Sequence, residues 1–126
     1  MASQRYSRLS DSELLLTVKN VADIQIELLD TLSGDAMGLI LFPPAQGRAR
    51  ELSWIARGLS EVCQGLASDL QQDGVSRDEV LSVLAELKRI RTDADRISAE
   101  VAYWDDQARQ VIAEMDVVGD DAEVGM

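Results

Sequence analysis

The sequence predicts an all-α protein: a three-helix antiparallel bundle with a long C-terminal helix, completed by oligomerisation. Apolar residues recur at a strict heptad spacing over the last third of the chain. Two Ser-x-x-Glu capping boxes each precede a long segment with helical apolar periodicity. The composition favours the same class, because 46% of the 126 residues are hydrophobic and only 4% are aromatic. Such a core consists mostly of the aliphatic residues that fill seams between helices.

The longest predicted helix covers residues 77–115. Ser76 is its N-cap, and Glu79 completes the capping box. With Val80 as position a, no polar residue interrupts positions a and d. The a positions are Val80, Leu87, Ala94, Val101, Ala108 and Met115, and the d positions are Val83, Ile90, Ile97, Trp104 and Val111. A seam of this length needs a partner helix beside it over its whole length.

The first predicted helix covers residues 11–32. Ser10 and Glu13 form its capping box, and Ser33-Gly34 is expected to end it. Its inner positions are Leu14, Val18, Val21, Gln25, Leu28 and Leu32, and Leu15, Ala22 and Leu29 widen this face. We expect a face this broad to touch two neighbouring helices. Gln25 is polar, and we expect it to fix the helix register rather than to contact a ligand.

The second predicted helix covers residues 46–72, and Asp73-Gly74 then makes the turn. Its predicted seam is Leu52, Ile55, Leu59, Val62, Leu66 and Leu70. Gly58 and Gly65 lie one heptad apart beside this seam. Either they allow a close helix approach, or they are weak helix positions tolerated on the solvent side. Cys63, on the other edge, is expected to pack as a small apolar residue rather than to act as a reactive thiol.

The segment between the first two helices, residues 35–45, is predicted to be an apolar loop. Pro43 and Pro44 argue against a continuous helix there, yet the segment is strongly apolar, whereas most loops are polar. Residues 1–9 are predicted to be a polar lead-in and residues 116–126 an acidic flexible tail. Residues 10–115 then form a single helical domain, as the chain length indicates.

The third predicted helix is longer than the second, and this difference predicts an interaction site. At 1.5 Å per residue the two helices measure about 57 Å and about 39 Å, so about 18 Å of the third helix has no neighbour. This overhang begins near Trp104, at the same end of the bundle as the apolar loop. The expected site residues are Leu39, Ile40, Leu41, Phe42, Trp104, Ala108, Val111, Ile112 and Met115. Either the loop covers the overhang within one chain, or another chain covers both features, and we expect the second arrangement.

Net charge limits the partners. At −11 the chain is repelled by phosphate backbones, so we expect no direct binding to nucleic acid. No apolar run approaches the roughly 18 residues of a transmembrane helix, so we expect no membrane contact. The single cysteine cannot form an internal disulfide, in agreement with a soluble cytoplasmic protein.

The residue types present favour binding over catalysis. The chain has no histidine, which removes histidine-based triads and most zinc sites. Asp93 and Asp95 face different directions on a helix, as do Asp105 and Asp106, so neither pair makes a two-carboxylate site. We therefore expect no catalytic residue, no cofactor and no metal.

The favoured function is a non-enzymatic protein–protein interaction module of the adaptor, chaperone or inhibitor type, which forms a homodimer. One alternative is an acidic inhibitor that mimics nucleic acid and covers a basic site on a partner protein. A third alternative, from another class, is a metal-dependent enzyme that uses helix carboxylates.

Overall fold

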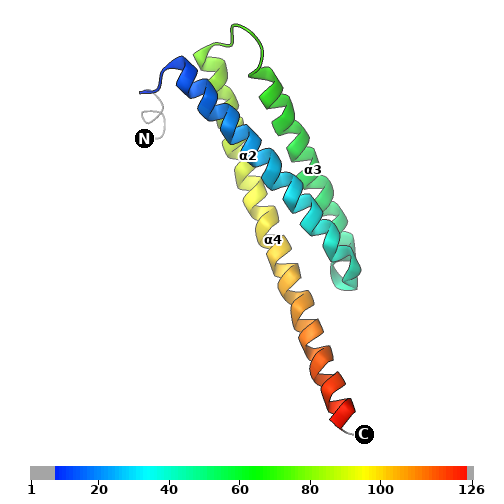
Figure 1. Ribbon diagram of the computed structural model, residues 1–126. Helices are drawn as coiled ribbons and strands as arrows, with labels where there is room; N and C mark the ends of the chain where they lie inside the picture. The colour runs from blue at the N-terminus through cyan, green and yellow to red at the C-terminus, as the bar shows by residue number, and fades with distance from the viewer. Residues whose placement is uncertain (1–7, 125–126) are drawn as a thin grey trace.

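The computed structural model describes the backbone of residues 8–124 and side chains as far as Met115, and this range is all-α (Figure 1). Its helices are α2 (Asp11–Gly38), α3 (Gln46–Asp69) and α4 (Arg77–Val124), with short 3₁₀ helices at η1 (Leu39–Leu41) and η2 (Pro43–Ala45). α2 packs along both α3 and α4, whereas α3 and α4 touch over a short stretch only. The all-α class is therefore confirmed, and the helix contacts support a bundle. None of the described helices is long and apolar enough to cross a membrane.

The structure confirms the start of α2 and corrects its end. Ser10 Oγ accepts from the Glu13 backbone N–H at 3.1 Å, and Glu13 Oε1 accepts from the Ser10 N–H at 3.1 Å. The helix does not stop at Ser33-Gly34 but continues to Gly38. Ala36 is fully buried in this extension, and such packing outweighs the low helix propensity of glycine. The expected lead-in, residues 1–9, lies mostly outside the described residues.

The predicted loop 35–45 is instead the last turn of α2 followed by η1 and η2. Phe42 adopts an extended conformation (φ −99°, ψ 104°), as expected for a residue before proline, and this separates the two 3₁₀ helices. Leu39 and Ala45 are buried, while Leu41 is 90% exposed. The connection is thus a compact apolar turn with one side chain fully in solvent.

The buried face of α3 coincides only in part with the predicted seam, of which Leu52 and Leu70 are buried. The side chains that α3 buries are mostly small: Ala49, Leu52, Ser53, Ala56, Ser60 and Cys63. Ile55 and Val62, which belong to the predicted seam, are 45% and 51% exposed. Small residues let α2 approach α3 closely, so the core uses the face rich in alanine and serine. The helix also ends at Asp69 rather than residue 72, and Gly74 makes the turn with a φ of +77°.

Gly58 and Gly65 lie on the open side of α3. They are therefore weak helix positions tolerated on the solvent side, and they do not serve a close helix approach. A Cβ atom at either position would meet nothing within 4 Å. We expect Gly58→Ala and Gly65→Ala each to raise the free energy of unfolding by about 0.5–1 kcal/mol, because alanine is the better helix former. Gly74→Ala is the opposing control, since its positive φ makes a side chain there strained. Urea unfolding measures all three, and a loss of stability in Gly58→Ala would contradict the open surroundings.

Polar pairs fix the register between α2 and α3. Ser33 Oγ and Ser53 Oγ are 2.9 Å apart, and Ser60 Oγ donates to Asp30 Oδ1 at 2.7 Å. The buried Gln25 Oε1 lies 3.9 Å from the Cys63 thiol, which donates a weak hydrogen bond to it. Burial raises the pKa of that thiol above its usual value, a shift that disfavours the nucleophilic thiolate. These contacts favour the register role expected for Gln25.

The heptad seam of α4 divides into a buried part and an uncovered part. Ser76 caps the helix by accepting from the Glu79 N–H at 3.2 Å. Every a and d residue through Val101 is buried, against α2 for most of that length. Beyond this point the helix does not end near Met115 but continues to Val124. Most of the segment 116–126, which we expected to be a flexible tail, is therefore helical, and 125–126 lie outside the described residues.

Candidate interaction groove

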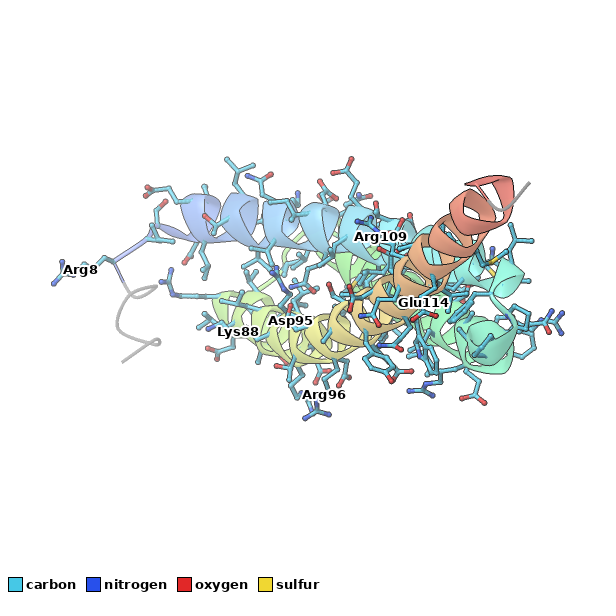
Figure 2. The ribbon with its side chains drawn as sticks, turned by 90° about the horizontal axis from the view of Figure 1, so that it is seen from below. Arg8, Lys88, Asp95, Arg96, Arg109 and Glu114 are labelled. Atoms are coloured by element: carbon cyan, nitrogen blue, oxygen red, sulfur yellow. The ribbon has the colours of Figure 1, made fainter. Side chains whose placement is uncertain are left out.

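The last part of α4 projects beyond the rest of the bundle. We call residues 104–124 the distal arm; at 1.5 Å per residue it is about 30 Å long. Figure 1 shows it extending past the ends of α2 and α3. Figure 2, seen from this end, shows Arg109 and Glu114 on α4 in front of the bundle. The overhang is thus longer than the 18 Å that helix lengths predict.

A groove of about 870 Å³ lies between the distal arm and the turn that connects α2 to α3. We call it the pole groove. Its turn side is formed by Leu39, Leu41, Phe42 and Pro43, and its α4 side includes Val101, Ala108, Val111, Ile112 and Met115. Asp35, Asp105 and Arg109 supply polar groups to its lining, and Arg109 Nε lies 3.0 Å from Asp105 Oδ2. The groove is therefore apolar with a small polar component.

The turn does not cover the arm in the described part of the chain. Ile112 and Met115 are each more than half exposed, and Val111 is 40% exposed. These residues belong to, or flank, the same heptad seam that is buried before Val101. The described part of the chain therefore leaves an apolar patch exposed on this side of the arm.

The structure brings most of the expected site residues together. Seven of the nine line the pole groove: Leu39, Leu41, Phe42, Ala108, Val111, Ile112 and Met115. Ile40 packs against the core outside the groove. Trp104 is likewise partly buried against the core, and its Nε1 donates to Glu100 Oε2 at 3.4 Å. Its ring meets Tyr103 edge-to-face at 5.1 Å between centroids, so Trp104 is held beside the groove rather than in it.

The groove lining also includes residues outside the expected set, among them Pro43, Asp105 and Arg109. The charged pair could have been recognised, because Asp105 and Arg109 have the i,i+4 spacing of a helical ion pair. Pro43 directly follows residues 39–42, which are among the expected site residues. Which edge of α4 faces the turn, however, depends on tertiary packing.

An ion pair joins α3 to α4 just before the arm begins. The Arg48 guanidinium binds Glu100 through two nitrogens, one of them, Nη2, 2.8 Å from Oε1, and Nη1 lies 2.8 Å from Glu51 Oε2. The hydrogen bonds from Arg48 hold the pKa of Glu100 below its usual value, and Trp104 adds a smaller effect of the same sign. The pair therefore links α3 to α4 close to the point at which α4 extends beyond the bundle.

This lowered pKa predicts a pH dependence. A carboxylate with a depressed folded-state pKa stabilises the fold above its unfolded-state pKa, and that stability disappears as pH falls through the folded value. We expect Glu100→Gln to lower the free energy of unfolding at neutral pH by less than about 1 kcal/mol, because the pair is partly exposed. The difference from the unsubstituted chain should vanish in acid. Urea unfolding across pH measures it, with the exposed Glu114→Gln as control, and a difference that persists in acid would contradict the ion-pair origin.

The acidic and thiol side chains of the described residues form no metal-ligand cluster, because no group of three of them is placed to hold a metal ion. The two acidic pairs noted in the sequence are largely engaged: Asp93, Asp95 and Asp105 each form an ion pair with an arginine on the same helix. Comparisons with protein-family models, curated proteins and solved structures find no match to this chain. Only the geometry of the chain itself therefore bears on its function.

Proposed function

We propose that this protein is a non-enzymatic interaction module that docks another polypeptide in the pole groove, and that the occupant is a second copy of the same chain. One observation carries the proposal. Two segments more than 60 residues apart, the turn and the distal arm, form one uncovered apolar groove. We also propose a cytoplasmic setting, with which the single buried thiol agrees.

A second copy supplies what the groove lacks. The groove presents an apolar wall without a facing helix, and the arm is a helix whose apolar stripe is exposed. A two-fold arrangement places each arm against the groove of the other copy, so the same residues are buried twice. Burial of exposed apolar area at about 25 cal/mol per Å² supplies the driving force.

Charge opposes this pairing through Asp35 in the groove lining and through the net charge of the whole chain. Asp105 and Arg109 neutralise each other beside the groove, whereas the chain as a whole carries −11. Added salt screens that net repulsion, so hydrophobic self-association should strengthen as ionic strength rises. Binding of a basic partner by an acidic nucleic-acid mimic should instead weaken as salt is added.

Light scattering over a concentration series tests the proposal. We expect the mass to rise from one chain towards two chains, and to do so at lower protein concentration in about 1 M salt than in about 0.01 M salt, where the Debye lengths are about 3 and about 30 Å. The mass of a single chain at every concentration and both salt levels would refute self-docking.

A further inference from the structure

A second apolar surface lies on α3, away from the pole groove. It is the seam that the heptad spacing predicts and that the bundle leaves half uncovered. Leu52 is buried, but Ile55 and Val62 are about half exposed, and Leu59 and Leu66 are only partly buried against the core. From Ile55 to Leu66 this row extends over about 17 Å, or three helical turns.

The uncovered row borders a cleft between α3 and α4. These two helices touch much less than either touches α2. Near the Gly74 turn the cleft opens into a groove of about 330 Å³, with Leu66 and Val83 as its apolar residues. A three-helix arrangement that is open along one side has the place of a fourth helix vacant.

The end of this cleft near the Gly74 turn is acidic. Asp69, Glu79 and Glu86 line the groove there, and the described lining residues include no lysine or arginine. Glu86 forms an ion pair with Arg89 of the same helix, so the acidic character of the groove rests mainly on Asp69 and Glu79. Further along the same edge of α4, Asp93 forms a long ion pair with Arg96 at 3.9 Å, and Arg96 points away from the bundle (Figure 2). Carboxylates beside an apolar floor favour an occupant with cationic flanks.

We propose that the α3–α4 cleft binds an amphipathic helix of a different protein, with an apolar stripe flanked by lysine or arginine, and thereby completes a four-helix bundle. Apolar anchors at i, i+3, i+4 and i+7 of that helix lie on the row from Ile55 to Leu66. Its basic flanks lie against Asp69 and Glu79, beside Glu86, which is already paired with Arg89. A second copy of this chain fits less well, because its net charge of −11 opposes an acidic rim.

The probe for this proposal is an 18-residue synthetic helix with Leu at positions a and d, Lys at e and g, and Ala elsewhere. Its matched control carries Glu in place of Lys. With the full-length chain at low salt, we expect fluorescence anisotropy to show binding of the Lys peptide and at least tenfold weaker binding of the Glu peptide. Equal binding of the two peptides would overturn the assignment of a basic partner.

Substitutions in the chain locate the binding surface. We expect Val62→Lys to weaken binding of the Lys peptide at least tenfold, whereas Leu16→Lys, at an exposed site on α2, should leave it unchanged. Circular dichroism verifies that each variant is folded. The double variant Glu79→Lys, Glu86→Lys leaves the apolar row intact. We expect it to weaken binding of the Lys peptide tenfold, so it tests the proposal even if Val62→Lys does not fold. Unchanged binding in the double variant would overturn the proposal.

Two further outcomes separate this cleft from the pole groove. Ile112→Asp should leave binding of the Lys peptide unchanged, because Ile112 lies on the distal arm. If Val62→Lys instead lowers the mass of the chain alone from two copies to one, a second copy occupies the cleft and the proposed basic partner is wrong.

Discussion

Replacing Leu41 and Ile112 together by aspartate is expected to abolish self-association, with a loss of at least about 100-fold in the association constant. The two residues face the pole groove from its opposite walls and are both well exposed in the single chain. In a docked pair each carboxylate would lose water without gaining a partner. A 100-fold loss corresponds to about 2.7 kcal/mol, within the usual cost of burying an unsatisfied polar group.

The exposure of both side chains makes this variant informative. Neither substitution should disturb the fold, so a change in mass reports on docking alone. Leu16→Asp is the matched control, because it places the same charge on an exposed leucine of α2. Sedimentation velocity measures the association of the unsubstituted chain, the double variant and the Leu16→Asp control. A double variant that associates as well as the control would exclude the pole groove as the contact.

Truncation of Leu52 to alanine is expected to cost about 2–5 kcal/mol of unfolding free energy. Leu52 is 1% exposed between α3 and its neighbours, so the substitution removes buried methyl groups and leaves a cavity. For a domain with a total stability of about 5–15 kcal/mol, this loss is large.

Ile55→Ala is the matched comparison, because it removes the same number of carbon atoms from the same helix and the same predicted seam. We expect it to cost less than about 1 kcal/mol, since Ile55 is half exposed in the free chain. Urea unfolding of both variants measures the difference. Similar costs at the two sites would mean that Ile55 is buried as deeply as Leu52, contrary to the exposure of this part of the α3 row.

The sequence predicted most of α4 and less of α3, for a physical reason. On α4 the large aliphatic residues are also the buried ones through Val101, so periodicity and burial agree. On α3 the bundle buries Ala56, Ser60 and Cys63, because the close approach of α2 needs small side chains. Heptad spacing is recognised from large apolar residues. On α3 it therefore predicts burial of the row from Ile55 to Leu66, which remains partly exposed.

The end of α2 shows a similar limit. Gly34 and Gly38 have low helix propensity, and propensity alone ends the helix at Gly34. The fold continues it because Ser33 binds Ser53 and Ala36 enters the core, which are contacts between segments distant in sequence. Tertiary contacts of this kind cannot be obtained from local propensity.

The candidate site was predicted in outline and not in detail. Helix lengths alone place the apolar turn and the overhang at one end of the bundle. They do not say which edge of α4 faces the turn, and this edge decides that Ile112 lines the groove while Trp104 packs toward Glu100. The length of the overhang was also underestimated, because α4 continues to Val124.

The most direct test of self-docking is an isotope-filtered NOE measurement on a sample that mixes ¹³C-labelled and unlabelled chains. We expect intermolecular contacts from the methyl groups of Leu41, Ile112 and Met115, and none from those of Val62. A fully associated sample with no intermolecular contact to these three methyl groups, or with contacts only to the α3 row, would contradict docking in the pole groove.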